Sequence, residues 1–408
     1  MTDTSITNSP ASSVDDAATP HLLTTPPVDD DATPHLLTTP PVTDAAPRES
    51  TYKPGAVNFG YSSWLLRTSW CSGRIGTRLV LTTLTLFALS ASVLLVAITL
   101  GDYPLTLVEV WRALTGSGEE FHKMIVLRWR LPVAIAALVF GALLGIGGAI
   151  FQSITRNALG SPDVIGFDAG SYTAVVISML ILGSGNYWNT AVAAILGGIV
   201  TAFVVYMLAY RRGIQGFRLI IVGIAVSAML GSINSYLITR ADIDDAMAVG
   251  FWGAGSLARV SWTSLVPSLI IAAVIFLAAA VLAPSLRRLE LGDDAAVTLG
   301  TSPVASRLGL IVAGVATTAL VTAAAGPIGF IALAAPQLAR RVTRTPGVSL
   351  AAAAAMGAAL LTSAQLLVLV ISHFYRPLPV GLVTVCVGGL YLIWLLIRES
   401  RIRYGAVR

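Results

Sequence analysis

Side chains able to do chemistry are few in this sequence, and they lie far apart. The only two lysines, Lys53 and Lys123, do not follow the glycine-rich pattern of a phosphate-binding loop, so no ATPase site is predicted on this chain. The two cysteines, Cys71 and Cys386, are too distant to indicate a disulfide framework or a cysteine metal site. The four histidines lack metal-ligand spacing (His21, His35, His122 and His373). We therefore predict a chain that is not an enzyme and holds no metal or cofactor.

Polar side chains within the apolar stretches are almost all uncharged. Asp168 is the only ionisable residue there that lies away from a boundary. Ion-coupled transporters use buried ionisable groups as relays, so a secondary transporter driven by an ion gradient is the less favoured alternative. The uncharged candidates for lining a translocation pathway are Gln152, Asn157, Ser227, Ser232, Asn234 and Gln365. Hydrogen bonds between helices, worth about 0.6 kcal/mol each, explain such residues equally well.

The elements that position these residues are membrane spans. Hydrophobic residues make up 55% of the 408-residue chain and charged residues 12%, against roughly 25% charged in soluble domains. The apolar residues collect in runs of about 20, the length that crosses a bilayer. We predict an all-α polytopic protein with about ten transmembrane helices in contact with membrane lipid. The expected spans are 79–100, 131–152, 164–183, 189–210, 219–239, 263–283, 308–325, 327–339, 348–372 and 379–397.

Two details qualify these spans. The eighth is too short to cross alone, and Gly326 and Pro327 separate it from the seventh. In the second span, small residues recur at the spacing that lets helix backbones approach closely: Gly141, Gly145, Gly148 and Ala149. We therefore expect a compact bundle that includes a partial helix.

The basic residues indicate the orientation. The formal net charge is +5, and the arginines concentrate in short loops between apolar runs. The positive-inside rule then places both termini in the cytoplasm, and membrane topology explains the charge better than a nucleic-acid partner does. The loop arginines assigned to this side are Arg211, Arg212, Arg218, Arg287, Arg288, Arg340, Arg341 and Arg344.

The first part of the chain differs in composition from the rest. It is rich in Pro, Thr, Asp and Ser, and TPHLLTTPPV occurs twice, at residues 19–28 and 33–42. Such a segment has too little apolar surface to offset its ordering entropy. We predict that residues 1–70 are a disordered cytoplasmic tail and that residues 75–400 form the transmembrane domain.

Four stretches of the membrane domain form recognisable motifs. They are Arg130-Leu-Pro followed by residues 141–171, with the run QSITRNALGSPDVIG; LRRLELGDDAAVTLGTS at 286–302; GPIGFIALAAPQLARR at 326–341; and LPVGLVTV at 378–385, followed by GGLYLIWLLIRES. Together they resemble the iron-siderophore and vitamin B12 importer permeases of the ABC superfamily (FecCD type). Three positions depart from the family's pattern, namely Val133 for Arg, Ala158 for Pro and Gln337 for His.

The resemblance implies a function and a set of partners. It implies a permease subunit that moves a ferric siderophore across the bacterial cytoplasmic membrane, powered by a separate ATPase. The implied partners are a second permease subunit, with a heterodimer favoured over a homodimer, two ATPase subunits that bind the ATP, and an extracytoplasmic substrate-binding protein. Gln337 and the final motif resemble ferric-enterobactin-type permeases most. A cobalamin or haem permease is the alternative within this family.

The resemblance also implies two contact sites. Arg128, Arg130 and Arg376 are candidates for docking the binding protein, although arginines at helix ends also snorkel to lipid headgroups. The segment 286–302 resembles the family's ATPase-coupling segment, and a solvated surface helix is the alternative. Its candidate coupling residues are Leu291, Gly292, Asp293, Asp294, Ala295 and Gly300.

Overall fold

The computed structural model describes residues 63–67, 72–183, 187–210, 216–345 and 347–405. The chain divides into two units, residues 1–58 and 59–408, and every described residue belongs to the second unit. Most of the predicted tail, including its repeat, therefore lies outside the described residues. The end of that segment differs from the prediction, because Ser63–Arg67 form a strand.

One β-hairpin departs from the predicted all-α fold. Strand β1 (Ser63–Arg67) pairs antiparallel with strand β2 (Ser72–Gly76), with Trp64 opposite Ile75. Gly76 leads directly into helix α1. The hairpin falls between the polar tail and the first apolar run, where neither composition nor helical periodicity points to a structure.

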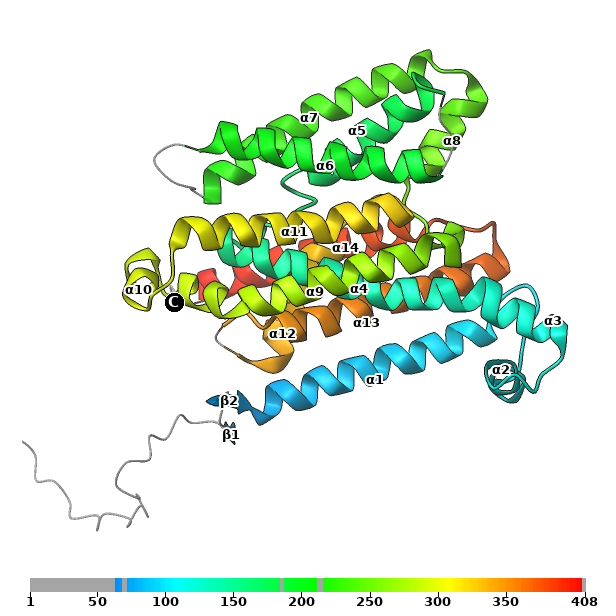
Figure 1. Cartoon of the computed structure of the whole chain (residues 1–408), viewed down its shortest axis with the longest axis horizontal. Coiled ribbons are helices and arrows are strands. Elements are labelled where there is room, and N and C mark those ends of the chain that lie inside the picture. The colour runs from blue at the N-terminus through cyan, green and yellow to red at the C-terminus, as the bar shows by residue number, and fades with distance from the viewer. Residues whose placement is uncertain (1–62, 68–71, 184–186, 211–215, 346, 406–408) are drawn as a thin grey trace, which may run out of the picture. The chain divides into compact units, whose positions relative to one another are not determined.

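Apolar helices occur in the predicted order and close to the predicted bounds. They are α1 (Thr77–Thr99), α4 (Leu131–Thr155), α5 (Phe167–Leu180), α6 (Tyr187–Ala209), α7 (Gly216–Arg240), α9 (Trp262–Glu290), α11 (Pro303–Ala325), α12 (Ile331–Thr343), α13 (Leu350–Phe374) and α14 (Val380–Gly405) (Figure 1). Among the described residues, seven helices are long and apolar enough to cross a membrane, and Phe167–Leu180 and Val380–Trp394 are shorter apolar helices. Helix α12 has only 13 residues, which agrees with the prediction of a partial helix.

Short helices connect these spans. They are α2 (Leu107–Leu114), α3 (Glu120–Lys123), the π-helix η1 (Met124–Arg130), α8 (Ile243–Gly253), the 3₁₀-helix η2 (Leu257–Arg259) and α10 (Asp293–Thr298). Only α10 was expected. Helix α2 depends on a capping box, in which the Thr106 hydroxyl accepts from the Glu109 N–H and the Glu109 side chain accepts from the Thr106 N–H. A helix of this length has too few turns for its periodicity to stand out in the sequence.

The centre of the membrane domain is α4, whose second half is almost completely buried. Glycines allow this burial, as the sequence indicated. A Cβ atom on Gly141 would collide with the backbone of Gly357 in α13, and one on Gly148 would collide with the Ala332 carbonyl oxygen in α12. Within lipid there is no hydrophobic force between helices, so close backbone contact of this kind holds them together through van der Waals packing. Helices α4, α12 and α13 therefore form one tightly packed block.

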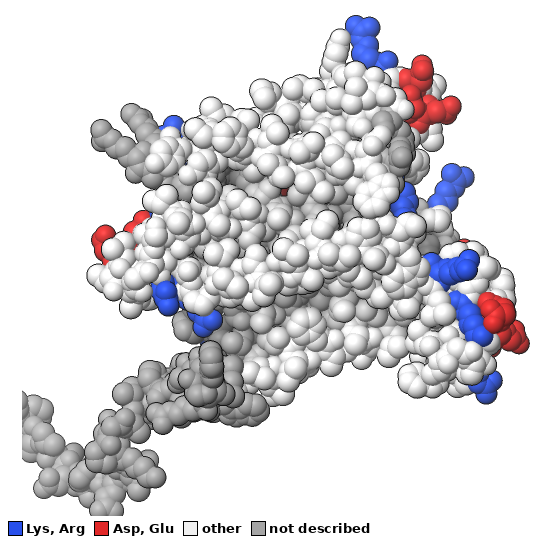
Figure 2. All heavy atoms as spheres, viewed as in Figure 1, with Lys and Arg blue, Asp and Glu red and all other residues white. Residues whose placement is uncertain are grey.

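The bundle has two opposite ends that can be named by their short helices. At the α2 end, the Trp262 indole at the start of α9 donates to the Leu127 carbonyl just before α4. At the α10 end, Ser153 near the last turn of α4 donates to Glu290, the last residue of α9. Figure 2 shows charged side chains gathered at these two ends, with a broad uncharged band between them. This distribution suits a protein that spans a bilayer.

Candidate coupling and docking sites

The predicted coupling segment forms a short helix between two glycines. Helix α9 ends at Glu290, and α10 follows after Leu291 and Gly292. Gly292 has φ +116° and Gly300 has φ +74°, conformations that other residues rarely adopt. The helix and its glycine boundaries are confirmed, and its role in coupling stays a prediction.

The apolar surface of this segment differs from the one expected from the sequence, which was formed by Leu291, Ala295 and Ala296. Ala296 is fully buried and packs in a cluster with Leu286 and Leu289 of α9, so it holds the segment to the bundle. Ala295 is half-buried. The large apolar side chains left exposed are Leu291 (68%), Val297 (59%) and Leu299 (52%). Sequence reasoning missed the last two because helical position alone does not say which side of α10 meets α9.

The two acidic residues of α10 have different surroundings. The Arg307 guanidinium at the start of α11 donates to both Asp293 carboxylate oxygens, at 2.9 and 2.5 Å. The Arg156 guanidinium also lies 3.6 Å from Asp293 Oδ1. Asp294 is exposed. Of the two, Asp294 is therefore the carboxylate free to meet another protein.

The docking candidates belong to elements at the α2 end, opposite the coupling segment (Figure 1). Arg128 is exposed in η1, and Arg376 is exposed in the connection from α13 to α14. Arg130 is instead half-buried, and it donates to the carbonyl oxygens of Ile98 (2.7 Å) and Tyr103 (2.6 Å). These bonds hold the turn after α1, so the Arg130 side chain is occupied within its own chain.

The pathway candidates in α4 and in the loop after it make internal contacts. Gln152 is buried, its Nε2 donates to the Leu333 carbonyl at 2.8 Å, and its Oε1 accepts from Arg340 at 3.4 Å. Asn157 Oδ1 accepts from the Leu159 N–H at 2.9 Å and shapes the loop that follows α4. The Gln152 bond is of the kind expected between helices, and the Asn157 bond is local to its loop.

The remaining pathway candidates lie on α7 and α13. Ser227 and Ser232 donate to the carbonyls one turn earlier, those of Gly223 and Ala228. Asn234 is buried, and its Oδ1 has no hydrogen-bond partner among the described residues. Gln365 is buried in α13. The six candidates are thus spread over three helices and one loop, and lining a pathway stays a prediction for all six.

Two carboxylates lie near the start of α5. Asp168 is buried and accepts from the Thr322 hydroxyl of α11 at 3.1 Å. Asp163 Oδ2 accepts from the Phe330 N–H, directly before α12, at 3.0 Å. A carboxylate at this position stabilises the positive end of that short helix. Sequence reasoning did not single out Asp163, because it lies at the boundary of the predicted third span.

Gln337 and Ala158, two of the positions that depart from the pattern given above, lie in contact. Gln337 Nε2 in α12 donates to the carbonyl oxygen of Ala158 at 2.7 Å. Ala158 itself stands where the family has Pro, so the two departures are in direct contact. The bond fixes the loop after α4 to the block of α4, α12 and α13.

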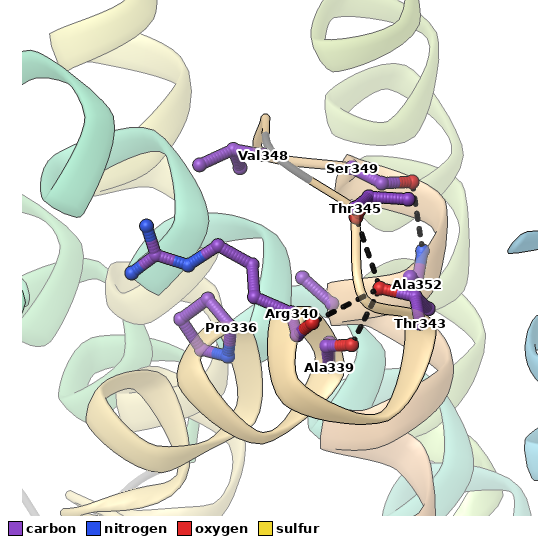
Figure 3. A pocket seen from close by; sticks show the side chains of 9 residues that line it. Pro336, Ala339, Arg340, Thr343, Thr345, Val348, Ser349 and Ala352 are labelled. Carbon is purple, nitrogen blue, oxygen red and sulfur yellow. Dashed lines mark hydrogen bonds between the residues drawn. The ribbon is translucent and has the colours of Figure 1, made fainter. Parts of the chain in front are cut away.

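A small, shallow hollow lies at the α10 end, between α12 and α13. Figure 3 shows Arg340, Thr343, Thr345 and Ser349 around it. The Thr343 hydroxyl donates to the Ala339 carbonyl, and it is also hydrogen-bonded to the Thr345 hydroxyl. Ser349 accepts from the Ala352 N–H. These hydroxyls therefore shape the turn between the two helices.

Comparison with known proteins extends the structural picture. The model of the FecCD transport family matches residues 86–398. The chain is 46% identical to the ferric enterobactin transport system permease protein FepG of Escherichia coli (strain K12), over 74% of this chain and 91% of that protein. It is 32% identical to the iron(3+)-hydroxamate import system permease protein FhuG of Bacillus subtilis (strain 168), over 77% and 96%.

A solved structure supports the fold. The structure of a metal-chelate type ABC transporter in an inward-facing conformation superposes with a TM-score of 0.66 and 22% identity, covering 78% of this chain and 99% of that chain. At this level of identity the likeness concerns the fold alone. The match to the family model carries the assignment: the chain belongs to the FecCD transport family, as a multi-pass membrane permease without an ATPase domain.

Proposed function

We propose that this permease moves a ferric siderophore across the bacterial cytoplasmic membrane as part of an ABC importer. The observation that carries the cargo assignment is the 46% identity with FepG, whose name states ferric enterobactin transport. FhuG, a ferric hydroxamate permease by name, is more distant at 32%. A catecholate siderophore is therefore the first cargo to test, and cobalamin or haem is the second candidate.

The proposed topology has ten helices crossing or entering the membrane, with both termini in the cytoplasm. The α10 end then faces the cytoplasm, which agrees with the arginines at 287, 288, 340, 341 and 344. The α2 end faces outward and exposes Arg128 and Arg376 to the substrate-binding protein. Charge pairing across such a contact favours fast, reversible docking.

The proposed partners at the α10 end are two ATPase subunits. Leu291, Val297 and Leu299 offer an exposed apolar surface there, and Asp294 adds an unpaired charge among the described residues. ATP binds to those subunits, and no cofactor is proposed on this chain. A second permease subunit, in a heterodimer, completes the translocation pathway.

In this mechanism the two ends act in turn. A loaded binding protein docks at the α2 end, and nucleotide binding in the ATPases moves the α10 segments. The helix bundles then exchange an outward-open arrangement for an inward-open one. Directionality comes from ATP hydrolysis in the partner subunits, which drives the cycle one way, and from the different affinities of ATP and cargo for the two arrangements.

Uptake of iron-55 tests the proposal directly. Cells with and without this gene are supplied with iron-55 bound to catecholate, hydroxamate or citrate siderophores, and uptake is measured over minutes. We expect the deletion to abolish uptake of one catecholate chelate and the intact gene to restore it. Unchanged uptake of every chelate contradicts the iron assignment, and labelled cobalamin and haem are then tested in the same strains.

The energy source separates this importer from a secondary transporter. Uptake that is lost on mutating the partner ATPase's catalytic residues, but that survives brief treatment with a protonophore, supports the importer. The opposite pattern supports ion-gradient coupling. The variant Asp294→Lys is included, and we expect it to lower uptake while leaving the amount of permease in the membrane unchanged.

A further inference from the structure

The last turn of α4 is attached to the coupling segment by two side chains. Ser153 Oγ donates to Glu290 Oε1 at 2.9 Å. Arg156 Nη2 donates to the Leu289 carbonyl oxygen at 3.2 Å and lies 3.6 Å from Asp293 Oδ1. Arg156 thus contacts both the end of α9 and the first residue of α10.

The backbone of Arg156 adds an independent observation. Arg156 has φ +50° in the left-handed region and ends α4 as its C-cap. Glycine is the usual residue in such a cap, and a side chain there costs roughly 1 kcal/mol. Only three described residues other than glycine have positive φ: Arg156, Phe330 and Arg344. The arginine at 156 is therefore disfavoured by its backbone, and its side-chain contacts offset that strain.

Glu290 extends the same attachment to α13. Its Oε2 accepts from the Val348 N–H at 3.5 Å, two residues before α13 begins at Leu350. Because glycines lock α4 against α12 and α13, a displacement of residues 289–293 is passed to that whole block. On the other side of Asp293, Arg307 attaches the segment to α11.

We infer that Arg156 is a positioning residue that ties the coupling segment to α4, so that α10 and the α4–α12–α13 block move together when the ATPases change state. This inference rests on the proposed coupling role of the segment. In this inference Arg156, the arginine of the RNALGSP motif, transmits movement between helices and does not bind the cargo. The block carries Gln152, Gln337 and the loop after α4, so its movement reshapes the α10 end of the bundle.

The chain supplies a matched control at Arg344. Arg344 is the C-cap of α12, has φ +52° and lies at the same end of the bundle. It is exposed, and its guanidinium has no hydrogen-bond or ion-pair partner in the described part of the chain. Arg156→Gly and Arg344→Gly thus remove the same charge from the same kind of cap. Both are compatible with folding, because glycine suits positive φ.

The functional experiment uses the complete importer in lipid nanodiscs, with its ATPase and binding protein. For Arg156→Gly we expect normal co-purification of the ATPase and an unchanged melting temperature or a slightly higher one. Stimulation of ATP hydrolysis by the binding protein loaded with its ferric siderophore falls about fivefold or more. Arg344→Gly keeps normal stimulation. Wild-type stimulation in Arg156→Gly, or an equal loss in both variants, overturns the inference.

A distance measurement tests the link without any cargo. Spin labels are placed at Leu159→Cys in the loop after α4 and at Thr298→Cys in α10, both exposed and outside the proposed ATPase surface, after replacement of Cys71 and Cys386. With intact Arg156 we expect the same label separation in the nucleotide-free and ATP–vanadate states, and with Arg156→Gly a separation that changes between them. A separation that changes already with intact Arg156 overturns the inference. Because no siderophore is present, failure of the cargo assignment does not affect this result.

Discussion

Gly145 in α4 lies directly against the carbonyl oxygen of Ala353 in α13, and a Cβ atom at position 145 would occupy the space of that oxygen. The contact joins two of the most deeply buried helices of the bundle. It shows how a chain with little charge holds its helices together within a membrane, since backbone proximity takes the place of hydrophobic burial.

Gly145→Ala should therefore destabilise the permease. The added methyl group forces α4 and α13 apart, at a cost of about 1–3 kcal/mol. The measurement is the melting temperature of the protein purified in detergent. Gly231→Ala is the matched control, because a Cβ atom at Gly231 in α7 meets nothing within 4 Å. Equal melting temperatures for the two variants would contradict the packing described here.

Gln337→Ala should loosen the loop after α4. It removes the 2.7 Å hydrogen bond to the Ala158 carbonyl and leaves that oxygen unpaired, which costs about 1–3 kcal/mol if water does not replace the donor. We expect faster hydrogen exchange across residues 157–166, with little change in α9. Gln337→His, which places the family's usual donor at this position, should restore part of the protection. Unchanged exchange in Gln337→Ala would show that the bond does not hold the loop.

Arg128 and Arg130 lie only two residues apart, but we expect Arg130 to affect stability and Arg128 to affect docking. Arg130→Ala loses both hydrogen bonds to the turn after α1, so its melting temperature falls, with an expected cost of about 1–3 kcal/mol. Arg128→Ala, at an exposed position, should leave the melting temperature unchanged and weaken binding of the substrate-binding protein. Binding is measured by surface plasmon resonance on nanodiscs at low and high salt. If the Arg128→Ala permease bound the substrate-binding protein as tightly as wild type at low salt, Arg128 would not be part of the docking site.

Helix α2 should depend on pH through its capping box. The Thr106 N–H and hydroxyl donate to Glu109, both at 2.7 Å, and lower the pKa of its carboxyl below the usual value. A lowered pKa in the folded state means that the cap stabilises α2 above the usual carboxyl pKa, and that this contribution is lost as the pH falls through the lowered value. Hydrogen exchange of α2 is compared between wild type and Glu109→Gln at each pH.

We expect wild-type α2 to exchange more slowly than the variant at neutral pH and at the same rate in acid. Because wild type and variant are compared at the same pH each time, the intrinsic pH dependence of hydrogen exchange cancels. If wild-type α2 still exchanged more slowly than Glu109→Gln in acid, the charge of Glu109 would not be the source of the cap's stabilising effect.

Several features of this protein were accessible from the sequence alone. Apolar runs are local and long, so they predicted the order of the ten apolar helices, including the short α12, and most of their bounds; α9 and α14 continue past their predicted ends to Glu290 and Gly405. Gly292 and Gly300, which flank DDAAVTL, predicted the bounds of α10, because positive-φ positions are marked by residue type. The motifs around Arg130, Arg156, Gln337 and Leu378 also indicated the family.

Only the tertiary structure decided what the polar side chains do. Nothing local distinguishes Asp293, held by Arg307, from its exposed neighbour Asp294, or Arg130, bonded to Ile98, from exposed Arg128. The partners of Gln152 and Gln337 lie about 180 residues away, at separations of 181 and 179. Residue type predicts that a buried polar group needs a partner, but the packing of distant helices selects that partner. Arg156 acquires its link to the coupling segment in the same way, through the meeting of α4 with the end of α9.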